Sequence, residues 1–373
     1  MHLWLGWVLG GVWALQGLTG AILVFHRDLD RAGLHATSGP ARSLDDLVAT
    51  AARAQGGRPI AIGLYYPEPS VLGVTFDRPA QGKRTVLVDA ATGRPLGLRE
   101  RSPASPTGEN IWRWVYNVHH SLLLGQRGEW LLGASGLLLL TMAGSGVWLG
   151  WPRAGQWRAA FAARRWRTRL QKAFGWHRAV GLCAATALAL SAVSGAIMDF
   201  GKPLRLWAER HAGYVSPYKP EPGPVPLRPI GADRALALAT RALPAASLTS
   251  ISLPTPASPV YLVRLRHSEE WRTWSGTSLV VVEAETGKIL STYDAAHGPL
   301  ANRIIDSAFP LHSGELAGLP GRILVMLGGL ALPVLYLTGL WAWFRRRHHA
   351  GRKDGLSLRA DASSPESHGR TES

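Results

Sequence analysis

Cysteine is almost absent from this 373-residue sequence, which has a single thiol, Cys183. One thiol excludes a disulfide within the chain, zinc and iron–sulfur sites built on several cysteines, and the C-x-x-C-H signature for covalent haem attachment. Any metal or redox chemistry must therefore rest on other side chains.

Acidic residues are missing from the long apolar stretches, apart from Asp199. This excludes a membrane-embedded chain of carboxylates, which many pumps and transporters use to move protons or cations. The sequence also contains no glycine-rich phosphate loop, no H-E-x-x-H zinc motif and no G-x-S-x-G elbow. Nucleotide-dependent and hydrolytic chemistry thus have no supporting motif.

Apolar residues make up 46% of the chain and gather in four stretches of membrane-spanning length. A 24-residue helix, such as the first stretch, is roughly 36 Å long, against a hydrocarbon core of about 30 Å. The first stretch has no basic region before it and no small-residue cleavage site after it, so we expect an uncleaved helix rather than a signal peptide. The predicted spans are His2–Phe25, Trp130–Trp151, His177–Phe200 and Arg322–Phe344.

The chain repeats itself. At a constant offset of 175 residues the first span matches the third, and at an offset of 193 the second matches the fourth. Register without gaps indicates an internal duplication. Because each copy contains two spans, both copies have the same orientation, related by a pseudo-two-fold axis along the membrane normal. The matched positions include His2 with His177, Gly6 with Gly181, Thr19-Gly20 with Ser194-Gly195, His119 with His312, and Ser145-Gly146 with Thr338-Gly339.

The net charge of +16 is unevenly distributed. Seven basic residues and no acidic one lie between Pro152 and Lys172, whereas the region from Arg27 to Glu109 has eleven basic and nine acidic residues. The positive-inside rule then predicts a cytoplasmic central loop, cytoplasmic termini and two long polar regions outside. The charge orients the protein in a lipid bilayer, and we expect no nucleic-acid partner.

The two polar regions share one pattern. Each is expected to hold a helix packed on a small antiparallel sheet, which ends at an Asp/Glu-Ala-x-Thr-Gly turn. The tail beyond Arg345 is expected to be disordered. The first region is predicted to have a helix at 43–55, strands at 60–66, 71–76 and 84–88 and a turn at 89–93; the second, a helix at 231–243, strands at 260–266 and 277–282 and a turn at 283–287.

Four of the thirteen histidines stand at repeat-matched places. His2 and His177 begin spans one and three at the predicted cytoplasmic face, and His119 and His312 precede spans two and four at the outer face. A pseudo-two-fold axis brings each pair together across the bundle, an arrangement that suits bis-imidazole haem ligation. The alternative is that these histidines are merely interfacial side chains.

Two further histidines are alternate ligands. His120-Ser121 resembles His312-Ser313 with a slip of one residue, so His120 could replace His119. His26 lies opposite Gly201 in the other copy and has no matched partner. The Ser/Thr-Gly pairs within the spans would let either neighbouring helices or a flat macrocycle approach closely.

In this order and twice over, these motifs resemble the PepSY-associated transmembrane family across nearly the whole chain. The resemblance rests on His2-x-x-x-Gly6, His119-x-x-Leu-Leu-Leu-Gly125, His177-x-x-x-Gly181, His312-Ser-Gly with Leu319-Pro-Gly-Arg322, and the two Asp/Glu-Ala-x-Thr-Gly turns. It implies a bacterial inner-membrane protein, often iron-regulated, whose better understood members are di-haem reductases of ferric siderophores. Such a protein passes electrons from a cytoplasmic donor to an iron chelate in the periplasm.

By that resemblance the chain would hold two haem b groups and need no catalytic residue beyond the haem ligands. The ligands would be His2, His177, His119 and His312, with His120 and His26 as alternates. The iron of a periplasmic ferric siderophore would be reduced and released as ferrous iron. The other function class is a non-enzymatic PepSY membrane module that binds or regulates a periplasmic partner protein.

The expected fold class is an integral membrane α-helical protein. Four transmembrane helices come from two tandem repeats, with two periplasmic α+β PepSY-like domains. The expected boundaries are 1–26 for helix one, 27–110 for the first domain, 111–151 for an interfacial segment and helix two, 152–172 for the basic loop, 173–200 for helix three, 201–309 for the second domain, 310–344 for a histidine segment and helix four, and 345–373 for the tail.

Overall fold

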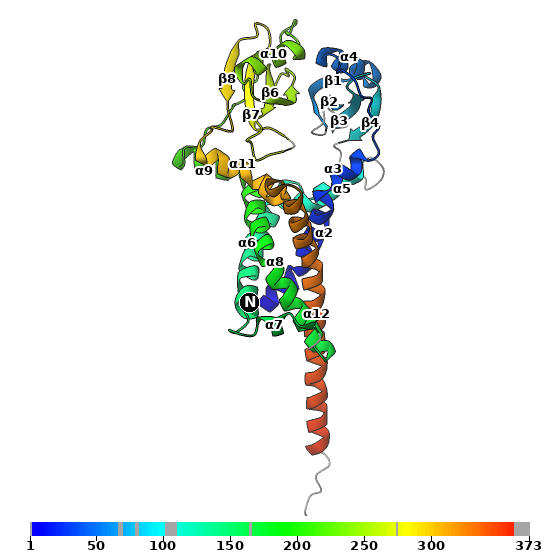
Figure 1. Cartoon of the computed structure of the whole chain (residues 1–373), viewed down its shortest axis with the longest axis vertical. Coiled ribbons are helices and arrows are strands. Elements are labelled where there is room, and N and C mark those ends of the chain that lie inside the picture. The colour runs from blue at the N-terminus through cyan, green and yellow to red at the C-terminus, as the bar shows by residue number, and fades with distance from the viewer. Residues whose placement is uncertain are drawn as a thin grey trace, which may run out of the picture.

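The computed structural model describes residues 2–65, 70–78, 82–100, 110–163, 166–273 and 275–361. Tyr66 at the end of a predicted strand, Arg164 and Arg165 of the basic loop, and the tail after Asp361 lie outside the described residues. The molecule is elongated: a bundle of long helices carries a sheet-bearing part at one end, and α12 extends beyond the other end (Figure 1).

Three helices are long and apolar enough to cross a membrane, and a bent pair would make a fourth span. The pair bends by 65° between Val8 and Gly10, so the first predicted span is broken rather than straight. The break precedes a glycine pair, Gly10-Gly11, which is a common cause of kinks. The three helices are α6 (Gln126–Gly150), α8 (Arg169–Asp199) and α12 (Gly318–Asp361); the pair is α1 (His2–Val8) and α2 (Gly10–Val24).

The bundle is closely packed inside and apolar outside. α2 and α8 both contact α12, and α6 contacts α8. A Cβ added to Gly17 of α2 would lie 2.3 Å from the carbonyl oxygen of Gly329, so here the two helix backbones touch. On the outer surface Trp148 is 85% exposed, as expected of a side chain that faces lipid.

The sheet-bearing part is one continuous antiparallel sheet in the order β4-β3-β2-β1-β5-β6-β7-β8. The sequence predicted two separate small sheets, but β1 pairs with β5 through Ala61↔Ser252, Ile62↔Ile251 and Gly63↔Ser250, so this expectation is wrong. The strands are β1 (Arg58–Leu64), β2 (Val71–Arg78), β3 (Gly82–Asp89), β4 (Pro95–Glu100), β5 (Ser247–Ser252), β6 (Val260–Arg266), β7 (Ser278–Glu283) and β8 (Ile289–Tyr293).

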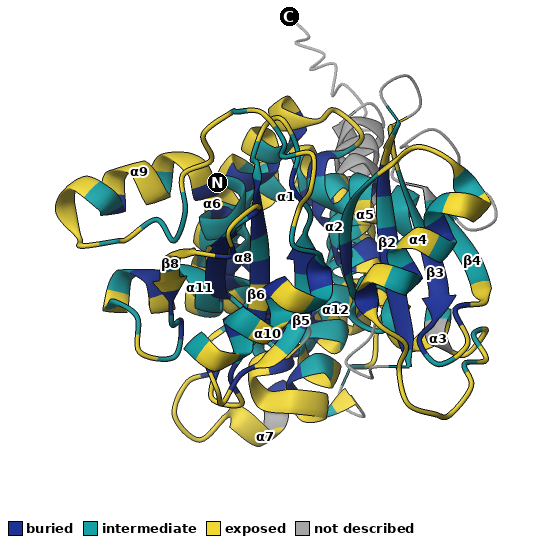
Figure 2. Ribbon diagram, turned by 90° about the horizontal axis from the view of Figure 1, so that it is seen from above, coloured by how far each residue is buried: buried dark blue, intermediate teal, exposed yellow. Residues whose placement is uncertain are grey.

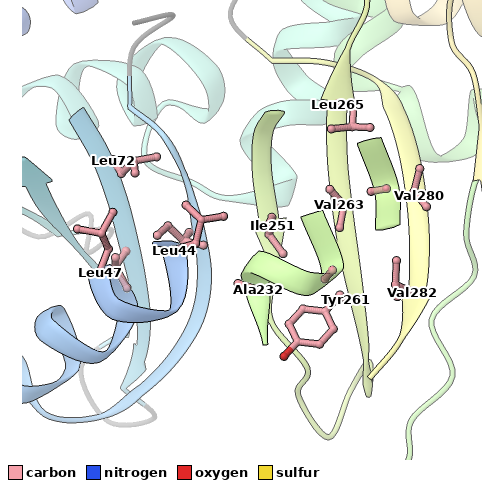
Figure 3. Packing of buried hydrophobic residues seen from close by; sticks show 14 of the residues in the cluster. Leu44, Leu47, Leu72, Ala232, Ile251, Tyr261, Val263, Leu265, Val280 and Val282 are labelled. Carbon is pink, nitrogen blue, oxygen red and sulfur yellow. The ribbon is translucent and has the colours of Figure 1, made fainter. Parts of the chain in front are cut away.

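Two helices cover one face of this sheet and share its core. α4 (Leu44–Gln55) begins after Ser43, whose hydroxyl accepts from the Asp46 amide as predicted for an N-cap. α10 (Ala232–Ala242) packs over the second half. Figure 3 shows Leu44 and Leu47 over the first half and Ala232 beside Ile251 and Tyr261 in the second.

The two helices cap each other across the seam between β1 and β5. The Asp45 carboxylate accepts from the amides of Ala232 and Asp233, at 2.7 and 3.2 Å. The Asp233 carboxylate accepts from the amides of Leu44 and Asp45, at 2.9 and 3.0 Å. Each helix N-terminus, where amides lack partners within the helix, is therefore closed by the other half.

Several short elements were not predicted from the sequence. One of them, α11, links the sheet to the bundle, as α5 does, and α9 has a mostly exposed surface (Figure 2). Where the sequence predicted a disordered tail beyond Arg345, α12 continues as far as Asp361. The α-helices that the sequence did not predict are α3 (His26–Arg31), α7 (Trp157–Ala160), α9 (Gly201–His211) and α11 (Leu300–Ser313); α5 (Ile111–Ser121) lies within the predicted interfacial segment.

Candidate functional site

Four histidines form two pairs inside the bundle, one pair near each end, and the two rings of each pair face each other. His119 of α5 and His312 of α11 have ring centroids 6.1 Å apart, and we call them the sheet-side pair. His2 of α1 and His177 of α8 have centroids 6.2 Å apart, and we call them the distal pair. The two pairings that the repeat offsets predict are therefore the two that the structure brings together.

Both members of the sheet-side pair bind a neighbouring helix through Nδ1. His119 Nδ1 lies 3.0 Å from the Gln16 carbonyl oxygen and 3.1 Å from the Thr19 hydroxyl. The Thr19 hydroxyl donates to the Leu15 carbonyl, so it accepts from the imidazole. A carbonyl oxygen can only accept, so Nδ1 carries the hydrogen and Nε2 keeps a free lone pair.

His312 has the same arrangement on α8. Its Nδ1 lies 3.0 Å from the Ser191 carbonyl oxygen and 3.2 Å from the Ser194 hydroxyl, which donates to Leu190. Burial lowers the pKa of His312, and burial with the nearby His312 ring lowers the pKa of His119 to about 3. Both imidazoles are thus neutral at physiological pH.

The distal pair repeats this pattern. His177 Nδ1 lies 3.0 Å from the Leu335 carbonyl oxygen and 3.2 Å from the Thr338 hydroxyl. His2 Nδ1 lies 3.0 Å from the Ser145 hydroxyl, whose own hydrogen goes to Met142. In all four cases one serine or threonine, with its own hydrogen committed to its helix, accepts from the histidine and fixes its tautomer.

A glycine directly after each of these hydroxyl residues makes room for the imidazole. A Cβ added at that position would meet the histidine Cε1 at 2.8 to 3.4 Å, which is too close or tight. The sequence left helix packing and macrocycle approach open for these Ser/Thr-Gly pairs, and the structure gives a third role: the glycine admits the ring that the hydroxyl holds. The glycines are Gly20, Gly146, Gly195 and Gly339.

The two alternate ligands make other contacts. His120 stacks on Tyr116 with ring centroids 5.0 Å apart, and its Nδ1 lies 3.5 Å from a Glu129 carboxylate oxygen. His26 contacts Trp112, with centroids 6.0 Å apart, and its Nδ1 bonds the Leu23 carbonyl. The structure therefore pairs His119, rather than His120, with His312.

Each pair has the spacing of two imidazoles that share a metal ion. A metal bound between them through nitrogens at about 2 Å would set the ring centres roughly 6 Å apart. Among the described residues no three His, Cys, Asp or Glu side chains gather as ligands for a bare ion. A metal at either pair must therefore bring its remaining ligands with it.

The second half of the sheet reaches the sheet-side pair through its β6–β7 loop. Thr273 donates from its amide and its hydroxyl to the buried Glu315 carboxylate, just after α11. The Arg272 guanidinium lies over the ring of Phe309, 5.0 Å from its centroid, one turn before His312. The sequence carried no signal for these contacts, because they join segments about 40 residues apart.

The family model for the PepSY-associated TM region matches residues 1–346, which include both histidine pairs and the whole sheet. No curated protein matches the chain.

Proposed function

The chain belongs to the PepSY-associated TM family, and from that premise we propose a haem-containing ferric-siderophore reductase of the bacterial inner membrane. Electrons enter from a cytoplasmic donor and leave to a chelate in the periplasm. The bundle has four spans from two tandem copies, with the bent α1 and α2 as the first span. The basic loop and both termini are cytoplasmic, and the continuous sheet is periplasmic.

The observation that carries this proposal is the shared hydrogen-bond pattern of the four histidines. Nδ1 is committed to a neighbouring helix in all four, which leaves Nε2 with a free lone pair. Packing alone does not require the same tautomer, the same hydroxyl and the same glycine four times. When bound at each pair, haem b would supply an iron centre that gains and loses one electron.

The chain's own residues bind and orient at these sites. Thr19, Ser145, Ser194 and Thr338 hold the four imidazole planes and keep each tautomer fixed. Second contacts of this kind raise the basicity of a metal-binding imidazole and fix its direction. The surrounding apolar helices favour haem, which is itself largely apolar.

The position of the sheet-side pair suits reduction of a bulky, water-soluble substrate. His119 and His312 sit on helices that join the bundle to the sheet, at the sheet end of the bundle. A ferric chelate that approaches from the sheet side does not have to cross the bilayer to reach a haem held there. The iron gains one electron, and the hard oxygen donors of the chelator hold ferrous iron far less tightly, so the metal dissociates. No base or nucleophile is required.

The test begins with the spectrum of the purified protein. We expect red protein with two haem b per chain and a reducible b-type spectrum. Protein reduced with dithionite and mixed with a ferric siderophore should reoxidise and yield ferrous iron, trapped by a colorimetric chelator. Colourless protein, or haem that stays reduced with every chelate tried, contradicts the proposal and favours a module that binds or regulates a periplasmic partner protein.

Variants then locate the periplasmic exit. His312→Ala and His119→Ala should each remove one haem and abolish ferric-chelate reduction, while the distal haem stays reducible. His120→Ala should keep both haems, because the structure pairs His120 with Tyr116 and Glu129. His297→Ala is the matched control, since this exposed imidazole bonds the Asp294 carboxylate and belongs to neither histidine pair.

A further inference from the structure

Rows of small residues line the helix faces between the two histidine pairs, and a large side chain interrupts each row once. Steps of three or four residues keep to one face of a helix. The row on α2 is Gly10, Trp13, Gly17 and Gly20, and His2 and Gly6 precede it on α1, before the 65° bend. The row on α8 is His177, Gly181, Ala185, Leu188, Ala192 and Gly195.

The large residue on α2, Trp13, lies between the levels of the two pairs. One turn above it the Gln16 carbonyl holds His119. One turn below it Gly10 faces the ring of Tyr336, next to Leu335, whose carbonyl holds His177. The two levels are themselves well separated, because His177 and Ser191 are 14 residues apart on α8, or roughly 21 Å.

The indole N–H of Trp13 is buried without a hydrogen-bond acceptor. Its side chain is only 5% exposed, and its indole Nε1 has no hydrogen-bond partner in the part of the chain that the structure describes. Buried indole N–H groups normally find an acceptor. The matched residue of the other copy is Leu188, so an apolar side chain satisfies the packing at this place.

We propose that Trp13 is the contact through which electrons pass between the two haem sites, and that its Nε1–H donates a hydrogen bond to a bound haem. This rests on the proposed function, because it needs both sites filled. One electron leaves the distal site and arrives at the sheet-side site. Trp13 keeps all its bonds and is neither oxidised nor reduced; it places a polarisable ring between the levels of the two cofactors. Its counterpart Leu188 packs against Ala331 of α12 and has no donor.

Two substitutions separate the ring from the donor. Trp13→Phe removes the N–H and keeps an aromatic ring, and should lower the midpoint potential of one haem, because a donor stabilises the more electron-rich reduced state. Trp13→Leu copies the other repeat and should also slow electron transfer between the haems by at least an order of magnitude. Trp148→Phe and Trp148→Leu are matched controls, since Trp148 lies on the lipid-facing surface of α6.

The measurements use full-length protein. Spectroelectrochemical titration of the wild type gives the midpoint potentials of the two haems. Titration of His177→Ala and His312→Ala, each expected to hold one haem, then assigns the haem that Trp13 contacts. In proteoliposomes reduced from within, a ferric chelate outside should reoxidise the haem in two phases. The fast phase reports the sheet-side haem, and only the slow phase, which needs transfer from the distal haem, should respond to Trp13→Leu.

Haem content separates the outcomes. Two haems with an unchanged slow phase and unchanged midpoints in both Trp13 variants overturn the inference and leave the reductase standing. If Trp13→Leu loses haem, the test rests on Trp13→Phe, whose ring nearly preserves the side-chain volume. An unshifted midpoint potential in Trp13→Phe overturns the donor role. Wild-type protein without haem overturns the proposed function itself, before any Trp13 variant is made.

Discussion

Replacing Asp89 by asparagine should destabilise the first half of the sheet by about 2 to 3 kcal/mol at pH 7. Asp89 ends β3 and is fully buried. Its carboxylate accepts from the amides of Thr37, Ala91 and Thr92, at 2.7, 3.0 and 3.0 Å. An asparagine side chain has one oxygen where Asp89 has two. Its NH2 group would lie against a backbone N–H, so two hydrogen-bond donors would face each other without an acceptor.

The same site gives a pH dependence with a definite sign. Burial alone would raise the pKa of Asp89, but the backbone donors of Thr37, Thr92 and Ala91 outweigh it and hold the pKa at about 2. Since this is below the unfolded value of about 3.9, the carboxylate stabilises the fold above that value and the effect is lost as the pH falls towards 2. The full effect is about 2.6 kcal/mol, and roughly half of it is gone by pH 3.

Hydrogen exchange with mass spectrometry measures this in the full-length protein. The free energy of opening of the β2 and β3 amides, corrected for intrinsic exchange, is compared between wild type and Asp89→Asn at pH 7 and pH 3. The difference should shrink by about half at pH 3. Glu283→Gln at the matching turn is the control, because Glu283 is partly exposed and its carboxylate accepts from Thr286, and it should change opening by less than about 0.5 kcal/mol. A difference that is independent of pH would refute the reasoning.

Three further outcomes follow from the architecture. A topology reporter fused after Gly93 should behave as periplasmic, because the proposed orientation puts the basic loop and tail in the cytoplasm; a cytoplasmic signal would contradict this orientation. His177→Ala should remove one haem of two and block electron entry while the sheet-side haem keeps its spectrum, and unchanged haem content would show the ligand assignment to be wrong. Asp45→Ala should speed hydrogen exchange at the start of α10, and Asp233→Ala should speed it at the start of α4. Each substitution should destabilise the helix that it uncaps by about 1 kcal/mol. Exchange that changes only in the substituted helix would rule out reciprocal capping.

Much of the bundle and both histidine pairings could be predicted from the sequence, because the repeat offsets align positions without a gap. Matching His119 with His312 needs only the 193-residue offset, and matching His2 with His177 only the 175-residue offset. The predicted helix at 43–55 has its N-cap at Ser43, where short-range capping rules apply. Each of these features depends on local pattern or on exact internal repetition.

The features that the sequence missed depend on contacts between distant segments. β4 and β8 are short edge strands. β5 has the polar sequence SLTSIS, which carries no strand pattern of its own and forms a strand because it pairs with β1. The role of Thr19 and Ser194 was hidden for the same reason, since a hydroxyl inside a span bonds its own helix by default. Only the fold shows that these hydroxyls also accept from a histidine of another helix.

The seam of the continuous sheet imposes an order on how the protein is made. Ile62 of β1 pairs with Ile251 of β5, 189 positions later in the chain. At about 5 to 20 residues per second, ribosomes need roughly 10 to 40 s to synthesise that interval. During this time two further spans must be inserted and the edge of β1 stays unpaired, a state that invites pairing with other chains. Biogenesis thus passes through a half-sheet that cannot be completed until β5 has been synthesised, and quality control has a defined interval in which to protect or degrade it.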